Sequence, residues 1–207
     1  MIHPNNLCCS CIDAAFCNAT ESQDNPPPFL MEQVHGTDVT VLTALPQKPL
    51  LCDALVTQTP NLQLTIKTAD CAPVLLADTK KKIIGAVHAG WKGAFQGILE
   101  NTLLTMLSLG AKIENIKAAI GPHLMQKSFQ VSATMQDLFP RTEHHFFENT
   151  PNGIYFDFTN YLCHRLNRAG VINIDVSCID TYTDLAYNSY RRDAQNLARQ
   201  YSFIKLK

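Results

Sequence analysis

The chain has 207 residues, of which 46% are hydrophobic, and its 17 basic and 18 acidic residues give a formal net charge of −1. This length and composition suit one sizeable buried core and do not demand two domains. The balanced charge offers no basic stripe for a polyanion, so nucleic acid is excluded as the expected main partner. With no secretory signal and no stretch long enough to span a bilayer, we expect a soluble, cytoplasmic protein that does not use a membrane.

Eight cysteines are scattered through a chain whose hydrophobic content needs no disulfide staples, so reduced thiols are expected. Four of them cluster near the N-terminus: Cys8, Cys9, Cys11 and Cys17. This cluster lacks the paired C-x-x-C spacing and the histidine partners of a zinc knuckle. We predict that residues 1–28 form a loosely ordered, oxidation-prone arm ending in the stiff proline run 26–28. Residues 29–207 are predicted to form a single domain.

The first part of this domain is predicted to be rich in strands. Leu62, Leu64 and Ile66 alternate with polar residues, which is the period-2 pattern of a half-buried strand. Short apolar runs predict further strands at 39–42, 54–56, 72–77 and 83–87.

Helices are predicted after Trp91. Apolar residues recur at intervals of three and four from 95 to 107, which predicts a helix with one apolar face and Gly110 at its C-terminal cap. A weaker helix is predicted at 132–138, and Thr159 is predicted to cap another that ends at Gly170.

The remaining segments are predicted as strands and one loop. Residues 141–151 are polar and contain His144 and His145, so we expect a solvated loop there. Strands are predicted at 116–120, 155–158, 174–178 and 201–204. Because strands outnumber helices and often follow one another directly, the pattern favours an α+β fold with a mixed sheet over a doubly wound parallel one.

The stretch 68–91, TADCAPVLLADTKKKIIGAVHAGW, concentrates the candidate chemistry. Cys71 comes just before one predicted strand and His88 just after the next, so a hairpin would bring the two side chains to the same end. His35 in QVHGTDV is a third candidate, because the glycine that follows it allows a sharp backbone turn.

These three residues suit a catalytic zinc site. Imidazole and thiolate are good zinc ligands, and three protein ligands leave a fourth position for a water whose pKa falls toward neutrality. Their spacing is not a compact motif, however. From composition alone, a buried free cysteine beside two hydrogen-bonded histidines is an equally good interpretation.

Two other chemistries stay open at this point. In one, no metal is present and His88 activates Cys71 as the nucleophile of a hydrolase or deamidase, with Asp70 or a backbone carbonyl orienting the imidazole. His35, which such a dyad does not need, argues for the metal instead. In the other, the histidines bind copper and the protein oxidises phenols, but such oxidases need more imidazoles than seven scattered histidines readily supply.

Seven motifs carry a resemblance to a known family: QVHGTDV, DALVT, TADCAPVLLAD, GAVHAGWKGAFQGILE, AAIGP, FDFTNYLCHRLNRAGV and SYRRD. In collinear order over residues 29–204 they resemble the YfiH family, whose older names are multicopper polyphenol oxidase and laccase. The family is related to mammalian laccase domain-containing protein 1. The CAPVLLAD and VHAGWKG motifs together are highly specific.

The resemblance implies a layered α-β-β-α fold akin to the catalytic domain of cytotoxic necrotising factor. It also implies a zinc-dependent enzyme of purine nucleosides, with phosphorolysis of adenosine, inosine, guanosine and methylthioadenosine by inorganic phosphate, and deamination of adenosine. The family's metal ligands carry over to His35, Cys71 and His88, and copper is the less favoured metal. The H-x-E and P-C-x-x-C signature of cytidine deaminases is absent.

Further residues are candidates for the reaction that this resemblance implies. Asp70 is our candidate proton shuttle, with capping of its turn or orienting of a ligand as an equal alternative. Phosphorolysis needs cations to hold phosphate, and Arg191, Arg192 and Lys92 are the candidates, the two arginines being favoured. Trp91 is more often a core residue than a platform for a purine.

The chain departs from the family in two places. Only 34 residues precede His35, where the family usually has a longer segment with an arginine and a glycine-rich turn. After AAIGP the family tends to have a cysteine and then a Tyr-Glu pair, whereas His123, Phe129 and Gln130 stand here, which removes a carboxylate. We expect these departures to affect substrate preference and turnover without touching the three ligands.

Overall fold

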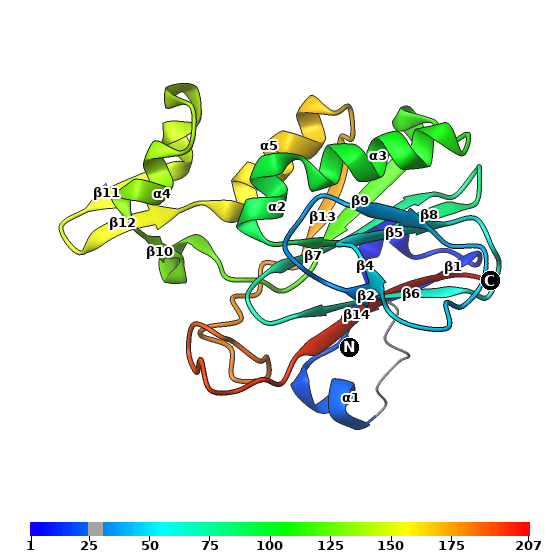
Figure 1. Ribbon diagram of the computed structural model, residues 1–207, viewed down its shortest axis with the longest axis horizontal. Coiled ribbons are helices and arrows are strands. Elements are labelled where there is room, and N and C mark those ends of the chain that lie inside the picture. Colours follow the sequence, from blue (N-terminus) through cyan, green and yellow to red (C-terminus); the bar gives the residue numbers. More distant parts are fainter. Residues whose placement is uncertain (25–30) are drawn as a thin grey trace.

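The computed structural model describes residues 1–24 and 31–207 (Figure 1). Its largest sheet has six strands in the order β13-β9-β7-β8-β5-β3. The sheet is mixed, because the outer pairs β13–β9 and β3–β5 are parallel while the three central pairs are antiparallel. The strands are β3 (Val39–Val41), β5 (Ala54–Thr57), β7 (Ala72–Asp78), β8 (Ile83–Ala89), β9 (Ile116–Ile120) and β13 (Asn173–Val176).

Strands β7 and β8 form the predicted antiparallel hairpin, with Ala72 opposite Ala89 at one end and Asp78 opposite Ile83 at the other. Every residue of both strands is buried. Both faces of the hairpin are covered, which explains why its sequence is continuously apolar and does not alternate. The prediction that Cys71 and His88 lie at the same end of a hairpin is therefore confirmed.

A second sheet packs against one face of the first. Its antiparallel strands, in the order β1-β14-β6, are β1 (Ile12–Phe16), β14 (Gln200–Leu206) and β6 (Gln63–Thr68). Side chains such as Leu64, Leu75 and Ile204 form a fully buried core between the sheets. A short parallel pair, β2 (Met31–Glu32) with β4 (Leu50–Leu51), lies beside them.

Helices cover the other face of the six-stranded sheet: α2 (Trp91–Gln96), α3 (Ile98–Ser108) and α5 (Phe158–Arg168) (Figure 1). The single helix predicted after Trp91 is in fact two, because Gly97 adopts a left-handed φ of 105° and ends α2. The N-cap of α5 is Asp157, whose carboxylate accepts the Asn160 N–H, and not Thr159 as predicted.

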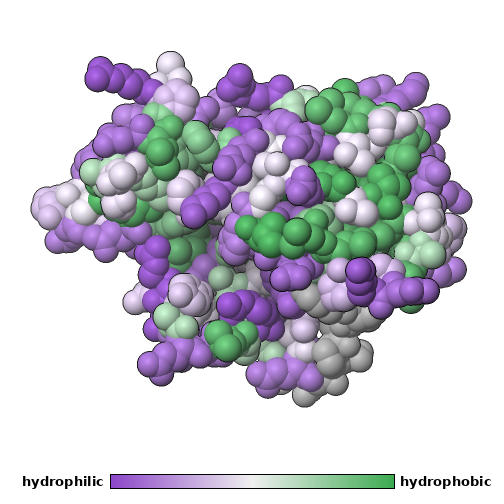
Figure 2. All heavy atoms as spheres, viewed as in Figure 1, coloured by the Kyte–Doolittle hydropathy of each residue, from purple (hydrophilic) through white to green (hydrophobic). Residues whose placement is uncertain are grey.

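Helix α1 (Ala19–Asp24) contacts β14, so helices lie outside both sheets (Figure 1). The predicted α+β class with a layered α-β-β-α arrangement is confirmed. Figure 2 shows hydrophobic side chains gathered over α3 and the neighbouring edge of the large sheet, where Leu104 and Val41 are 64% and 40% exposed. No helix in the described ranges combines the length and apolar character needed to cross a membrane.

A smaller sheet extends from the main body beside α4 (Ala133–Asp137) (Figure 1). Its strands, in the order β10-β12-β11, are β10 (Gln130–Val131), β12 (Gly153–Phe156) and β11 (Phe147–Thr150). The loop predicted for 141–151 is wrong for most of its length, since a 3₁₀ helix and β11 occupy it. Buried Phe146 and Phe147 supply the reason, because Phe147 stacks on Phe156 at 4.7 Å. The 3₁₀ helices are η1 (Asn5–Leu7), η2 (Ile113–Asn115), η3 (Gln126–Ser128) and η4 (Arg141–Phe146).

The prediction of a loosely ordered N-terminal arm is wrong for residues 1–24. Strand β1 pairs with β14 along its whole length, and Leu7, Ile12 and Phe16 are buried between the sheets. A Cβ on Gly121 would lie 2.3 Å from the Phe16 ring, so Phe16 fills the space that this glycine leaves. The proline run 26–28 and the boundary predicted at residue 28 lie outside the described residues, and that boundary stays a prediction.

Candidate metal centre

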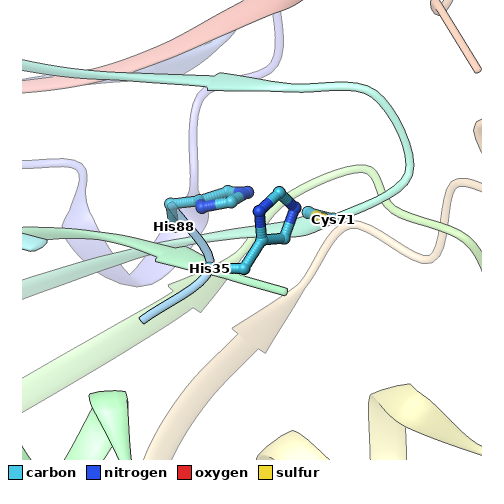
Figure 3. Close-up of side chains that lie close together, drawn as sticks. All are labelled: His35, Cys71 and His88. Atoms are coloured by element: carbon cyan, nitrogen blue, oxygen red, sulfur yellow. The ribbon is translucent and has the colours of Figure 1, made fainter. Parts of the chain in front are cut away.

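His35, Cys71 and His88 meet at one end of the β7–β8 hairpin. Their ligand atoms all lie within 4.8 Å of one another, and Figure 3 shows the three side chains pointing toward one another. The His35 and His88 rings meet edge to face with centroids 4.8 Å apart. His35 is exposed, Cys71 is half-buried and His88 is buried, so the cluster sits at the surface end of a buried strand. Among the described residues, it is the one group of three such donors close enough to hold a metal ion.

The backbone around His35 is organised by Asp53, a fully buried residue just before β5. Its carboxylate accepts three successive main-chain N–H groups: Val34 at 3.2 Å, His35 at 2.9 Å and Gly36 at 2.7 Å. His35 has a left-handed φ of 62°, which is uncommon for a residue with a side chain. Such strain persists where surrounding contacts over-determine it. Asp53 supplies those contacts.

Asp53 also orients His88. Its Oδ1 accepts a 2.7 Å hydrogen bond from Nδ1 of His88. Burial opposes ionisation of Asp53, but His88 and the Gly36 N–H outweigh it and lower the pKa of the carboxyl. An ionised carboxylate only accepts, so Nδ1 keeps its proton, and Nε2 is the nitrogen that can bind a metal once its own proton has left.

Cys71 is held as a thiolate. Burial opposes ionisation, but the charge of His88 and hydrogen bonds from both histidines lower the pKa of the Cys71 thiol to about 6. At His88 burial lowers the pKa of the imidazole, but Cys71 and Asp53 outweigh burial and raise that pKa to about 9. A thiolate and two imidazoles, one fixed through its second nitrogen by a carboxylate, are a donor set that zinc prefers. The residues present therefore fit a zinc ion.

Two glycines of the HAGWKG motif allow the close approach of these loops. A Cβ on Gly90 would lie 2.7 Å from Cδ2 of His35 and 3.4 Å from Sγ of Cys71. A Cβ on Gly93, in the first turn of α2, would lie 2.7 Å from the carbonyl oxygen of Gly36. Both distances show that only glycine lets the QVHG loop pack against the start of α2.

The cluster opens into a cavity of about 830 Å³. Aromatic and aliphatic side chains form much of its wall: Trp91, Leu124, Phe129, Phe158, Tyr190 and Leu197. Charged side chains also line it: Glu32, Lys67, Asp70, Arg191 and Arg199. A large apolar concavity with a few charged groups beside a cluster with perturbed pKa values is the usual form of a ligand site.

Asp70 lines this cavity, but both oxygens of its carboxylate already accept hydrogen bonds. Oδ1 accepts the Thr181 hydroxyl at 2.7 Å, and Oδ2 accepts the Arg191 main-chain N–H at 2.6 Å. Asp70 therefore ties the loop carrying Arg191 to the turn carrying Cys71, which favours the orienting role over the proton shuttle. The carboxylate that orients His88 is Asp53 and not Asp70.

The three predicted cations are placed differently. Arg191 lines the cavity, donates from Nη1 to the carbonyls of Ser128 and Gln130, and lies 5.7 Å from the centroid of the Phe129 ring. Arg192 donates to four main-chain carbonyls of its own loop and does not line the cavity. Lys92 is exposed beside Trp91 and does not line it either. Substrate contact by Arg192 and Lys92 stays a prediction.

The residues that depart from the family pattern have structural partners. His123 is fully buried, with Nδ1 bonded to the Gly121 carbonyl at 2.8 Å and Nε2 bonded to the Thr159 hydroxyl at 2.8 Å. Phe129 forms part of the cavity wall. The Gln130 amide donates to the carbonyl of Asn152 at the exposed turn between β11 and β12. Phe129 therefore lines the cavity directly, whereas His123 packs behind the wall against Phe158.

Asp53 is the functional residue that sequence reasoning missed. DALVT counts among the family motifs, but its acidic residue is assigned no role from sequence. The available signal is a carboxylate directly before a fully buried strand, where an unpaired charge would be costly. Such a residue needs partners, and here these are the imidazole of His88 and the main-chain N–H groups around His35.

Comparisons with known proteins show the family to which the chain belongs. Residues 13–207 match the model of the family described as multi-copper polyphenol oxidoreductase laccase. A Mycobacterium bovis protein named purine nucleoside phosphorylase is 39% identical over 170 residues, covering 79% of this chain and 66% of the relative. The Shigella flexneri purine nucleoside phosphorylase YfiH is 35% identical, covering 86% of this chain and 74% of the relative. The chain thus spans slightly less than two thirds of the mycobacterial relative's length.

Among solved structures, the Bacillus licheniformis hypothetical protein YfiH superposes with a TM-score of 0.80 at 26% sequence identity. The match covers 91% of this chain and 79% of that one.

Proposed function

This chain belongs to the multi-copper polyphenol oxidoreductase laccase family, and we propose that it is a zinc-dependent enzyme of purine nucleosides that works in the cytoplasm. Its reactions would be phosphorolysis of adenosine, inosine, guanosine and methylthioadenosine, and deamination of adenosine. The observation that carries the proposal is a zinc-type donor set opening into a large aromatic-walled cavity. The names of the mycobacterial and Shigella relatives support the substrate class.

His35, Cys71 and His88 would hold the zinc, which when bound supplies a Lewis acid and lowers the pKa of a coordinated water. Asp53 keeps the proton of His88 on Nδ1 and fixes the main chain of His35. These contacts make the ligand positions independent of substrate.

The cavity wall suits a purine. Phe129, Phe158 and Trp91 offer flat apolar surface at which a purine ring can stack and exclude water. Arg191 lies at the same wall, held by the carbonyls of Ser128 and Gln130, and we propose that it contacts the nucleoside. Asp70 fixes this loop through the Arg191 N–H.

Phosphorolysis and deamination need different contributions from the residues of the site. In phosphorolysis an oxygen of inorganic phosphate forms a bond to the anomeric carbon while the bond from that carbon to the purine nitrogen breaks, and the purine leaves with a proton. Positive charge develops at the sugar, so nearby anions and a positioned phosphate lower the barrier. In deamination, water adds to the ring carbon that bears the amine, and ammonia leaves.

The test pairs metal content with turnover. Purified protein is analysed by elemental mass spectrometry and then incubated with adenosine, with and without phosphate. About one zinc per chain is expected, with adenine formed only in the presence of phosphate and inosine formed without it. Cys71→Ala should lose both metal and turnover, whereas Cys163→Ala, a half-buried cysteine outside the cluster, should lose neither. Full zinc occupancy in Cys71→Ala would refute the ligand assignment.

A second candidate is a metal-free cysteine hydrolase or deamidase, and one observation favours it. Asp53, His88 and Cys71 form a chain in which a carboxylate orients an imidazole paired with a thiolate, which is the arrangement of cysteine nucleophiles. The hydrolase would keep its activity in excess chelator and lose it on alkylation of Cys71. The zinc enzyme would lose its activity in chelator and regain it with zinc.

Copper-dependent oxidation of phenols is the least favoured alternative. A coupled oxygen-reducing site needs several clustered imidazoles. Within the described ranges, the one donor cluster of three or more residues contains two.

A further inference from the structure

Three cationic side chains line the cavity that holds the zinc-ligand cluster: Lys67, Arg191 and Arg199. Arg191 is held at the aromatic wall, since its guanidinium donates to two main-chain carbonyls and lies over the Phe129 ring. Lys67 and Arg199 come from a different part of the fold, since Lys67 lies on β6 of the second sheet and Arg199 directly precedes β14 of the same sheet. The sequence offers no motif that marks either of them.

Strand pairing brings Lys67 and Arg199 together. Lys67 lies on β6 directly opposite Tyr201 of β14, and Arg199 precedes Tyr201 by two residues. Residues two apart project to the same face, so Arg199 is the diagonal neighbour of Lys67, within reach of a long side chain. Both side chains are half-buried. Burial and the charge of Arg199 both lower the pKa of Lys67.

Lys67 is also fixed relative to the zinc-ligand loop. The side-chain amide of Gln33 donates to the Lys67 carbonyl at 2.7 Å and accepts the Lys67 N–H at 2.9 Å. Gln33 stands two residues before His35, and Lys67 stands four residues before Cys71. The backbone that carries this cation is thus tied to both ligand-bearing segments.

Arg199 keeps part of its guanidinium available. Its Nη1 donates to the carbonyls of Asn196 and Ala198. Among the described residues, its Nε and Nη2 have no hydrogen-bond partner, and no carboxylate forms an ion pair with it. Two adjacent like charges in a partly buried cavity repel each other, and a bound anion removes that repulsion.

Among the described residues, neither acidic side chain of the cavity wall forms an ion pair with Arg199. Asp70 is occupied by Thr181 and the Arg191 N–H, and Glu32 is exposed at the start of the loop that leads to His35. The Nε and Nη2 donors of Arg199, beside the Lys67 side chain in the same cavity, therefore suit an anion supplied from solution. A planar guanidinium beside an ammonium group is a common combination for phosphate.

We propose that Lys67 and Arg199 form the subsite that binds inorganic phosphate for phosphorolysis. This assignment rests on the proposed function, since it names the binding site of that reaction's second substrate. It also divides the cavity, with the nucleoside at the aromatic wall beside Arg191 and phosphate beside β6 and β14.

The test measures phosphate binding directly and then in the reaction. Zinc-loaded wild type, Lys67→Gln, Arg199→Gln and the double variant are titrated with sodium phosphate by calorimetry. Lys205→Gln is the matched control, because it removes a positive charge from the same strand and face outside the cavity. Loss of one charge-assisted contact should weaken phosphate binding about tenfold or more, with Lys205→Gln matching wild type. The KM for phosphate should rise by the same factor and that for adenosine by less than about twofold.

The outcomes separate the subsite from the function. Unchanged phosphate affinity in the folded double variant overturns the subsite, even where adenine still forms. Binding of adenosine monophosphate by wild type without binding of inorganic phosphate overturns it too, because the cations would then serve a nucleotide. Phosphate binding that needs both cations, in a protein that forms no adenine, supports the anion subsite and refutes phosphorolysis.

Discussion

Asp53 offers the sharpest test of how the site is built, through the substitution Asp53→Asn. The change keeps the shape of the side chain and replaces one acceptor oxygen by a donating amide. On the Oδ1 side that amide would face the N–H of His35 and Nδ1 of His88, and on the Oδ2 side it would face the N–H groups of Val34 and Gly36. Either orientation sets donors against donors.

The expected loss of stability follows from the number of donors that are left without an acceptor. A buried donor left without an acceptor costs about 1–3 kcal/mol, so two such donors lower the free energy of unfolding by about 2–6 kcal/mol. If His88 accepts from the new amide, its proton moves to Nε2, the atom needed for zinc. Removing a carboxylate that orients a metal-binding histidine typically weakens the metal about 10- to 100-fold.

The assay separates stability from metal binding. Asp78→Asn is the matched control, because Asp78 is also fully buried and accepts the main-chain N–H groups of Lys80, Lys81 and Lys112, away from the cluster. Urea unfolding is measured for both variants, and zinc affinity is measured by competition with a chromophoric chelator. Both variants should lose stability, but only Asp53→Asn should lose zinc affinity. Zinc affinity equal to wild type in folded Asp53→Asn would refute the orienting role.

Three further predictions address the thiol, the glycine and the N-terminal strand. In metal-free protein, the iodoacetamide rate at Cys71 should rise as pH increases through its pKa of about 6, since the thiolate forms there. A midpoint near 9.0, the ordinary pKa of a cysteine thiol, would contradict the pairing with His88. Gly90→Ala should weaken zinc at least about tenfold while the protein stays folded, because the added Cβ displaces the His35 ring; unchanged zinc affinity would show that the loop relaxes freely. Phe16→Ala should lower the free energy of unfolding by about 3–5 kcal/mol, whereas Leu185→Ala, at a position 80% exposed, should change it by less than about 0.5 kcal/mol. Equal effects in these two variants would place β1 outside the core.

The sequence predicted that Cys71 and His88 lie together with His35 because two kinds of signal agree there. The apolar runs on either side of the lysine turn predict a hairpin, and the hairpin alone places Cys71 and His88 at one end. His35 is different, since no periodicity connects it to that end. Its motif and the family resemblance are what predict His35 as a member of the cluster. In the structure, a hydrogen bond from its main-chain N–H to Asp53 holds its loop in place.

The N-terminal strand could not be predicted in the same way. Ile12–Phe16 is short, lies among cysteines and polar residues, and pairs with β14, which begins at Gln200. Pairing between segments so far apart in the chain leaves no local pattern, because each strand contributes only half of the face that is buried. The same limit applies to Lys67 and Arg199, which become neighbours only through the register of β6 and β14.

The segments of the site are held together by carboxylates and not by the three candidate ligand side chains, His35, Cys71 and His88. Asp53 binds the His35 loop to β8, and Asp70 binds the turn of Cys71 to the loop of Arg191. Both His35 and Asp70 have left-handed backbones, at φ of 62° and 82°, which cost of order 1–3 kcal/mol each outside such a frame. The unfolded chain does not favour these left-handed backbone conformations. The strained residues therefore mark where the fold spends stability on geometry, and the arrangement of His35, Cys71 and His88 exists only once the contacts of Asp53 and Asp70 have formed.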